Sequence, residues 1–360
     1  MLRTRILSAA ELFEPRLRED WTHLVQIASA ATPFQTPEWQ ETWAKHYLGA
    51  KKLRAIEIRE GEDLVGLYPL VRTRGPWRAL RPAGIGPSDY LHPLVADEVT
   101  KSVVPLIREA LLDQKDADLV DLHQLRSDKP LADCTPEGGV TIPQATCLTL
   151  DLPGTYDGYL GMLGKSLRYD VRKLDKTLFT TGKAHIQYAT AEDVSQGMDV
   201  LFDQHKRRWR KRWQPGAFTA KGQRFHHEWA SLAIKKGWLR LGVLHYKSKP
   251  IGAIYAMALG NTTYFYQAGM DPEFSSVSPG TLLVANTIRQ SIEEGRLRFD
   301  FMRGDEGYKR RWKPQHALEN RRLLVPTRGG VGRLGAKWNL KASEIEAKVR
   351  AKLERHASSP

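Results

Sequence analysis

Alternation of apolar and polar positions predicts a β-hairpin in the second half of the chain. Aromatic and aliphatic residues fill positions 251–259 and 262–268, and Gly260 and Asn261 between them form a typical two-residue turn. The next apolar positions repeat at helical spacing as far as Gly295. An apolar run at 297–302 then predicts a buried strand. The expected order is hairpin, helix and strand.

Ser278 and Pro279 predict where that helix begins. Serine is a preferred N-cap residue, and proline is favoured at the first helical position. A helix start that follows a strand presents free backbone N–H groups and the positive end of the helix dipole. This arrangement suits a phosphate or pyrophosphate group, although many such helix starts bind nothing.

The first half of the chain shows the same order of elements. Residues 53–59 and 64–72 read as paired strands, 99–112 as a helix and 119–122 as a buried strand. The two halves therefore look like degenerate copies of one mixed α/β (α+β) plan. We expect domains at residues 1–150 and 151–325, followed by a basic tail at 326–360 with an amphipathic helix at about 336–356.

Cations gather on two expected helices of the second half. A helix beginning at Tyr156 places four cations on one face, at Lys165, Arg168, Arg172 and Lys176. A later helix runs into residues 205–213, which hold six cations and two tryptophans. Such a cluster contacts phosphate, or it is an exposed helix end whose dipole favours cations.

The overall charge points to an anionic partner. The formal net charge is +14, and from Arg321 onward ten Lys or Arg residues stand against three Glu. Phosphorylated small molecules, nucleotide sugars, anionic lipid surfaces and RNA would all suit this charge, as would a plain solvated surface. The basic tail would suit peripheral association with an anionic membrane.

Other compositional features narrow the class of protein. The 41% hydrophobic content is typical of a globular chain, and no apolar run approaches the roughly 20 residues of a membrane span. Cys134 and Cys147 are too few for a disulfide framework or a cysteine metal cluster. We expect a cytoplasmic, metal-free protein.

A series of short motifs in fixed order resembles one superfamily. They lie at residues 33–43, 88–90, 166–172, 205–218, 250–253, 264–271, 278–280 and 299–312. Their order is similar to that of the GNAT acyltransferases, and most like the tandem-GNAT branch with CelD-like cellulose-biosynthesis acetyltransferases and Fem aminoacyl transferases. The resemblance covers residues 32–325 and implies two tandem GNAT-like acyl-CoA acyltransferase domains. Residues 274–280 replace the Gln/Arg-x-x-Gly-x-Gly/Ala loop of ordinary GNAT enzymes.

This resemblance implies acyl transfer from a thioester, usually acetyl-CoA, to an amine or hydroxyl. The co-substrate would lie near Gln267, Ser278, Pro279, Gly280 and Thr281. Because proline has no N–H, Gly280 and the backbone after it must supply the donors to the pyrophosphate.

The resemblance also implies catalytic residues after the buried strand. Glu306 is the first choice for the base, and Asp300 and Asp305 are alternatives. Tyr308 and Lys309 are candidates to stabilise the oxyanion and the thiolate. Two structural alternatives stay open: Asp300 holds a backbone N–H group, and Tyr308 is only a packing residue.

Acceptor binding is expected at Asp89, Tyr90, His205, Arg208, Arg212 and Trp312. The alternative for His205, Arg208 and Arg212 is that they are plain surface residues. Three functions remain. The first is CoA-dependent acetylation of a sugar or lipid-linked precursor for exopolysaccharide or cell-envelope synthesis. The others are a Fem-type transferase that uses aminoacyl-tRNA, and an inactive nucleotide-sensing scaffold.

Overall fold

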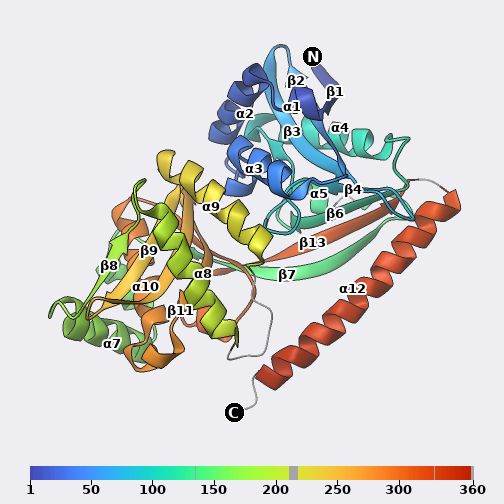
Figure 1. Ribbon diagram of the computed structural model, residues 1–360. Helices are drawn as coiled ribbons and strands as arrows, with labels where there is room; N and C mark the ends of the chain where they lie inside the picture. Colours follow the sequence, from blue (N-terminus) through green and yellow to red (C-terminus); the bar gives the residue numbers. More distant parts are fainter. Residues whose placement is uncertain (134, 211–217, 328, 358–360) are drawn as a thin grey trace. The chain divides into compact units, whose positions relative to one another are not determined.

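A computed structural model describes residues 1–133, 135–210, 218–327 and 329–357 (Figure 1). The chain forms two compact units. The first unit comprises Met1–Ala30, Tyr47–Gln144 and Glu319–Pro360, and the second comprises Ala31–His46 and Ala145–Leu318. Neither unit is a single continuous segment of the chain.

The sheet of the first unit runs β1-β2-β3-β4-β6-β13. Neighbouring strands are antiparallel except β4 and β6, which are parallel. The strands are β1 (Leu2–Ser8), β2 (Lys52–Glu60), β3 (Asp63–Arg72), β4 (Ala79–Pro82), β6 (Leu119–Arg126) and β13 (His316–Pro326), and the short β5 (Leu94–Val95) pairs with β3. The helices of this unit are α1 (Ala9–Leu12), α2 (Pro15–Ile27), α4 (Thr100–Leu112), α5 (Pro130–Asp133) and α12 (Gly329–Ala357), with a 3-10 turn η2 (Asp97–Val99).

The second unit repeats this topology with the order β8-β9-β10-β11-β12-β7. Only β11 and β12 are parallel, as β4 and β6 are in the first unit. The strands are β7 (Val140–Asp151), β8 (Ala184–Tyr188), β9 (Leu239–Tyr246), β10 (Lys249–Leu259), β11 (Thr262–Met270) and β12 (Arg298–Arg303). The helices are α3 (Pro37–Tyr47), α6 (Tyr156–Met162), α7 (Lys165–Leu174), α8 (Val194–Arg210), α9 (Ala220–Lys235), α10 (Pro279–Glu293) and α11 (Gly307–Arg310), with short turns η1 (Pro33–Gln35), η3 (Asp175–Phe179) and η4 (Pro272–Val277).

The predicted fold class is confirmed, and the internal repeat is visible in the topology. In each unit a helix, α4 or α10, leads into a strand, β6 or β12, that lies parallel to a strand earlier in the chain, β4 or β11 respectively. The expected equivalence of the strands near residues 119–122 and 297–302 therefore holds.

Helices cover both faces of the β10–β11 pair. Ala268 of β11 belongs to the core that contains Leu283 of α10. The next residue, Gly269, lies against α8, where a Cβ atom would come 2.5 Å from the backbone nitrogen of His205. Successive residues of a strand face opposite sides, so α8 and α10 occupy opposite faces of this sheet.

Several elements differ from the expectations. The helix expected from Tyr156 is divided into α6 and α7, because Gly164 adopts an extended conformation between them. Strands β1 and β13 were not predicted. Helix α12 begins at Gly329 rather than near residue 336.

The units also differ from the expected ranges 1–150, 151–325 and 326–360. Residues 31–46 join the second unit, where Trp39 packs edge-on against Phe225 and Trp229 with ring centroids 4.9 and 5.0 Å apart. Residues 319–360 join the first unit, where Arg322 of β13 donates to the carboxylate of Asp121 in β6 at 2.7 Å. In both places a side chain buried with distant partners overrides sequence continuity.

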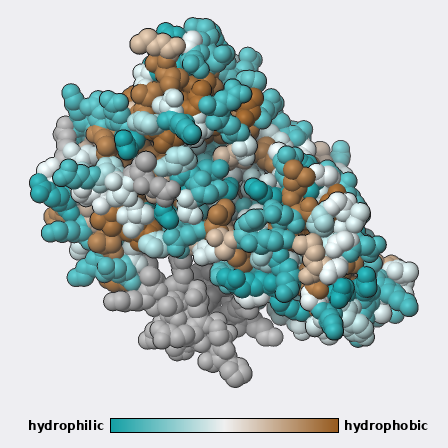
Figure 2. All heavy atoms as spheres, turned by 180° about the vertical axis from the view of Figure 1, so that it is seen from behind, coloured by the Kyte–Doolittle hydropathy of each residue, from teal (hydrophilic) through white to brown (hydrophobic). Residues whose placement is uncertain are grey.

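The face of the molecule in Figure 2 carries mostly hydrophilic residues with hydrophobic ones scattered among them. Among the described residues, no helix combines the length and the apolar character that crossing a bilayer requires.

Candidate active site

Strands β11 and β12 separate shortly after they begin. Their parallel ladder joins residues Thr262, Thr263 and Tyr264 to Arg298, Phe299 and Asp300. Farther along, β12 pairs on its other side with β7 through Arg303 and Cys147. The two strands thus open a gap on the side where β11 leads towards α10.

Asp300 stabilises the bend in β12. Its Oδ1 atom accepts a hydrogen bond from the backbone N–H of Met302 at 2.7 Å, and Met302 has a φ of 60°, in the left-handed region. Its side chain is 4% exposed. Of the two roles expected for Asp300, this geometry matches the structural one, in which the carboxylate accepts a hydrogen bond from a backbone N–H group.

A cavity of about 310 Å³ lies beyond the opening of the strands. Five of the predicted site residues line it, namely Gln267, Gly280, Thr281, Tyr308 and Trp312. The remaining lining residues are Leu167, Phe265, Ala268, Met270, Val284 and Arg311. The cavity therefore combines a largely apolar wall with a few polar groups, which is typical of a small-molecule site.

The start of α10 forms one wall of this cavity. Ser278 precedes the helix in a left-handed conformation, and its side chain makes no capping hydrogen bond, contrary to the expected N-cap role. Instead, its carbonyl accepts from the backbone N–H groups of Thr281 and Leu282 at 3.0 and 3.2 Å. Because Pro279 has no N–H, Gly280 supplies the first N–H of the helix, and among the described residues this group has no acceptor.

Gly280 is also a place of close approach. A Cβ atom there would lie 2.6 Å from the sulfur of Met270. A larger residue would push Met270 into the cavity or obstruct access to the N–H group. The predicted residues Ser278 and Pro279 do not line the cavity, and they contribute by directing the chain into α10.

Short helix α11 brings Tyr308 to the cavity and turns Lys309 away from it. The Tyr308 side chain is 40% exposed and lines the cavity beside Arg311. The buried Lys309 ammonium donates to the carbonyls of Arg303 and Gly304 at 2.7 and 3.1 Å, and it lies 2.9 Å from the carboxylate of Glu306. Neither Glu306 nor Lys309 lines the cavity.

The predicted acceptor residues are dispersed. The carbonyl of Trp312 accepts from the Tyr159 hydroxyl at 3.0 Å, while its side chain lines the cavity. His205 is buried in α8, with its ring centroid 4.9 Å from that of Phe218. The side chain of Arg208 and all of Arg212 lie outside the described residues.

Asp89 and Tyr90 belong to the first unit, in which both are buried. Asn320 donates to the Asp89 carbonyl at 2.7 Å. The guanidinium of Arg126 lies 5.2 Å from the centre of the Tyr90 ring. Both residues are thus held in the first unit by β6 and β13.

Helix α7 and the turn η3 that follows it carry a row of cations whose side chains line an open groove. The groove is formed by Lys165, Arg168, Tyr169, Arg172, Lys173, Lys176 and Thr177. Among the described residues, none of these five cations has a carboxylate partner. Leu167 of the same helix is buried and lines the cavity. We call these five cations the α7 cluster.

Leu167, Met270 and Arg311 also line the cavity, although their residue types did not predict it. Arg311 had a local signal, because it belongs to the basic run before Trp312. Leu167 and Met270 lie in the motif segments 166–172 and 264–271, but their place in the cavity depends on how α7 and β11 pack.

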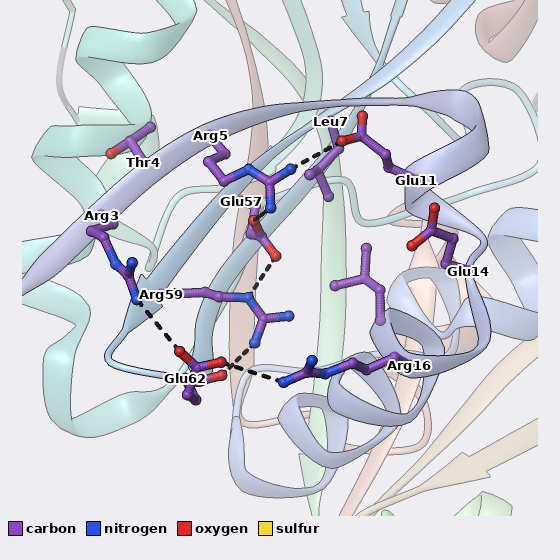
Figure 3. Close-up of a pocket in the computed structure, with 11 residues that line it drawn as sticks. Arg3, Thr4, Arg5, Leu7, Glu11, Glu14, Arg16, Glu57, Arg59 and Glu62 are labelled. Carbon is purple, nitrogen blue, oxygen red and sulfur yellow. Dashed lines mark hydrogen bonds and ion pairs between the residues drawn. The ribbon is translucent and has the colours of Figure 1, made fainter.

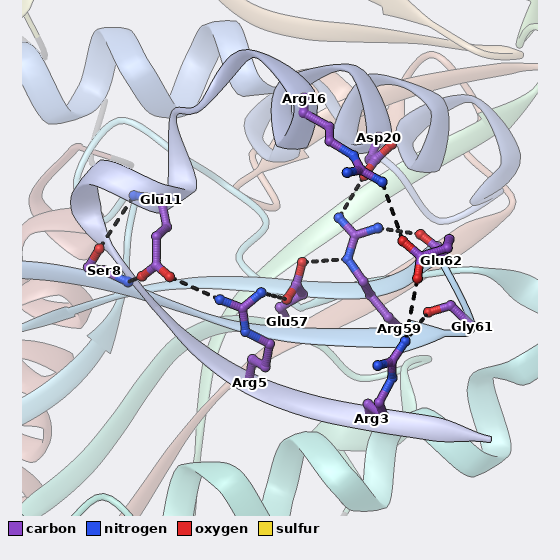
Figure 4. Close-up of polar contacts among 10 residues, drawn as sticks. All are labelled: Arg3, Arg5, Ser8, Glu11, Arg16, Asp20, Glu57, Arg59, Gly61 and Glu62. Atoms are coloured by element: carbon purple, nitrogen blue, oxygen red, sulfur yellow. Dashed lines mark hydrogen bonds and ion pairs between the residues drawn. The ribbon is translucent and has the colours of Figure 1, made fainter.

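A larger hollow, about 650 Å³, lies in the first unit between β1, β2 and the start of α2 (Figure 3). Its charges neutralise one another: Arg5 pairs with Glu11, Arg59 with Glu57, and Arg3 and Arg16 with Glu62 (Figure 4). These pairs account for the arginines of the hollow, so we assign the active site to the cavity beside α10.

Part of the chain matches a family of known proteins. Residues 165–310 match a family described as an acetyltransferase (GNAT) domain. The match runs from α7 to α11 and so includes the helices and strands that build the cavity. No curated protein matches the sequence.

Solved structures share the fold at low sequence identity. The crystal structure of FemX has a TM-score of 0.62 at 11% identity, over 84% of this chain and 95% of that one. A conserved protein of unknown function from Bacteroides thetaiotaomicron has a TM-score of 0.56 at 13% identity, over 86% and 97%. The C-terminal domain of a putative lysylphosphatidylglycerol synthetase from Agrobacterium fabrum has a TM-score of 0.53 at 13% identity, over 88% and 93%. Residues 165–310 thus match a GNAT acetyltransferase domain, and this match supports an acyltransferase activity.

Proposed function

We propose that the protein transfers an acyl group, acetyl in the simplest case, from acyl-CoA to an amine or hydroxyl. The acceptor is a sugar or lipid-linked precursor in exopolysaccharide or cell-envelope synthesis. The observation that carries the donor assignment is the cavity lined by β11 and α10, together with the Gly280 N–H at the start of α10, which has no acceptor among the described residues. A helix start with an available N–H group favours a pyrophosphate.

The residues present fit acyl-CoA along the length of the cavity. The pyrophosphate would accept from Gly280 and lie near Thr281, while Phe265 and Val284 would contact the apolar part of the pantetheine arm. The α7 cluster would hold the remaining phosphate, because its cations have no carboxylate partner among the described residues.

The reaction needs a group that gives a proton to the leaving sulfur. The acceptor nitrogen or oxygen bonds to the thioester carbon, the C–S bond breaks, and the thiolate takes a proton. The Tyr308 hydroxyl is the candidate donor, because Tyr308 lines the cavity and is partly exposed. Glu306, with its side chain 55% exposed, remains the candidate to take the acceptor's proton, through an intervening water.

A second candidate function is transfer from an aminoacyl-tRNA. The α7 cluster favours it, because a row of cations that have no carboxylate partner among the described residues suits a nucleic-acid backbone as well as a single phosphate. The two donors differ in what they require: acyl-CoA needs the cavity and Gly280, whereas a tRNA also needs an extended basic surface.

Direct binding and turnover measurements separate these donors. We expect saturable binding of acetyl-CoA by calorimetry, and release of free coenzyme A when an amino sugar is added. Aminoacyl transfer from charged tRNA without coenzyme A binding would replace the proposal by the second candidate. Absence of binding to either donor would favour the inactive scaffold.

The variant Gly280→Val tests whether acetyl-CoA binds at the start of α10. We expect the Kd for acetyl-CoA to rise about tenfold, the cost of roughly one charge-assisted hydrogen bond. The control is Gly154→Val, since Gly154 belongs to the same unit and has no neighbouring atom within 4 Å of an added Cβ. Equal affinity in the two variants would contradict a site at α10.

A further inference from the structure

Helix α12 packs on the first unit through small and polar residues. A Cβ atom at Gly332 would lie 2.2 Å from the Asp118 carbonyl oxygen, and one at Gly335 would lie 2.9 Å from the Trp77 ring. The side chain of Arg322 donates to Asn339 at 2.8 Å and to Ser343 at 2.6 Å. The inward face of this helix is therefore set by close backbone approach and hydrogen bonds.

The large apolar residues of α12 point to solvent instead. Val331, Leu334, Trp338 and Ile345 are exposed by 52, 64, 65 and 54%. Their spacings of three, four and seven residues place them on one side of the helix, and we call them the apolar ridge. A helix on the surface of a globular domain normally buries its apolar side, so this arrangement is the reverse of the usual one.

A row of cations runs beside the apolar ridge. Arg333, Lys337 and Lys341 recur every four residues and are exposed. Among the described residues, none of the three has a carboxylate partner. From Arg321 onward, the sequence holds ten Lys or Arg residues and three Glu, so the positive charge extends along this part of the chain.

We propose that α12 is a membrane-docking helix that lies on an anionic lipid surface. The apolar ridge enters the level of the headgroups and upper acyl chains, and the cation row contacts lipid phosphates. Trp338 adds an aromatic ring suited to the membrane interface, and Trp77 of the same unit supplies a second ring 6.4 Å away.

Two other occupants fit the surface less well. A second copy of the chain would bring the same row of cations to the contact, which charge repulsion opposes. A nucleic acid would satisfy the cations and leave the apolar ridge in water. An anionic lipid surface satisfies both features at once, and the proposal holds whichever acyl donor the cavity takes.

The test is co-sedimentation of the full chain with lipid vesicles. We expect binding to phosphatidylcholine vesicles that contain about one third phosphatidylglycerol, and little binding to pure phosphatidylcholine. The double variant Lys337→Gln, Lys341→Gln should lower partitioning about 25-fold, roughly fivefold for each cation. The double variant Leu334→Gln, Ile345→Gln should lower it at least about tenfold.

Matched variants control for general loss of charge or apolar surface. Lys101→Gln with Lys115→Gln removes two exposed cations from the same unit, and Leu297→Gln removes a 59% exposed leucine elsewhere. Both should bind vesicles as the unmodified protein does, and every variant should keep its melting temperature. Equal binding to neutral and anionic vesicles, or no vesicle binding, would overturn the proposal. The proposal would also be overturned if substitutions in the apolar ridge left vesicle binding unchanged and altered only the oligomeric state of the protein, or only its binding to RNA.

Discussion

At the residue scale, the contacts of the buried Lys309 ammonium are those of a residue that stabilises the fold. Its Nζ atom lies within hydrogen-bonding distance of two backbone carbonyls and one carboxylate, those of Arg303, Gly304 and Glu306. These three acceptors match the three N–H donors of an ammonium group, which leaves none for an oxyanion. Lys309 therefore holds the end of β12 against α11, and Tyr308 becomes the more promising catalytic group.

The two neighbours should respond differently to substitution. Lys309→Met leaves two buried carbonyls without their donor, and we expect a loss of about 2–4 kcal/mol in the free energy of unfolding. Tyr308→Phe should melt normally and lose turnover by a factor on the order of 10². Melting curves and steady-state kinetics on both variants make the comparison. A Lys309→Met protein with normal stability and lost kcat would return Lys309 to catalysis.

At the scale of elements, Asp121 connects strands of the first unit. Its buried carboxylate in β6 accepts from Arg322 of β13 at 2.7 Å and from Arg81 of β4 at 2.8 Å, and His123 lies 3.0 Å away. Burial alone would raise the pKa of Asp121, but hydrogen bonds and charge from His123 and Arg322 hold it well below its usual range. The carboxylate is therefore ionised throughout the neutral range, and this contribution to stability is lost only in strong acid.

Removing that carboxylate should loosen the contact between these strands. Asp121→Asn leaves Arg322 buried without its counter-charge, and we expect a loss of about 3–5 kcal/mol in the free energy of unfolding. The matched variant Asp203→Asn removes an exposed partner of Arg207 and should cost about 0.5 kcal/mol or less. Urea unfolding measures both. Similar losses in the two variants would mean that Asp121 is not a central contact.

The elements that the sequence predicted correctly are those determined by residues close to one another in the chain. The hairpin of β10 and β11 follows from alternating apolar residues around Gly260, and Gly280 follows from the helix start after Ser278. Strand β13 escaped prediction because Asn320 and Arg322 interrupt its apolar pattern. Their partners, Gln124 and Asp121, lie far away in sequence, so no local pattern reveals that these polar side chains are buried.

The same limit applied to the candidate site. Lys309 resembled a catalytic lysine in sequence, but its carbonyl acceptors depend on how the chain bends after β12. Leu167 reaches the cavity only because α7 packs beside α10. The sequence therefore indicated which residues lie near the site, whereas the direction in which each side chain points depended on tertiary packing.

At the scale of the whole molecule, each unit holds a buried neutral histidine. Burial lowers the pKa of His92 in the first unit to about 3, with the nearby Arg126 charge acting in the same direction. Burial likewise lowers the pKa of His226 in the second unit to about 3, with a smaller effect from His227. Below pH 6.5 the unfolded chain binds protons at these positions and the folded protein does not. The free energy of unfolding therefore decreases as the pH decreases.

This linkage predicts acid sensitivity in both units. Between pH 7 and pH 5, each histidine should lower the free energy of unfolding by about 2 kcal/mol. His226→Gln should flatten the dependence by one such contribution, whatever its effect at pH 7. The control His227→Gln alters a 31% exposed ring and should keep the original slope. Urea titrations across this range check the prediction, and an unchanged slope for His226→Gln would refute it.

Because β13 closes the sheet of the first unit, the unit that begins the chain can be completed only near the end of synthesis. The ribosome makes β6 early, but the partner for one of its edges emerges only after nearly the whole second unit. The second unit already holds β7 when β12 appears, and its last residue is Leu318, so it can complete its sheet first. The nascent chain thus carries an unpaired, leucine-rich strand edge for most of its translation, and such edges promote aggregation. A fragment ending near residue 150 should precipitate when expressed alone and become soluble when residues 319–360 are supplied as a separate peptide.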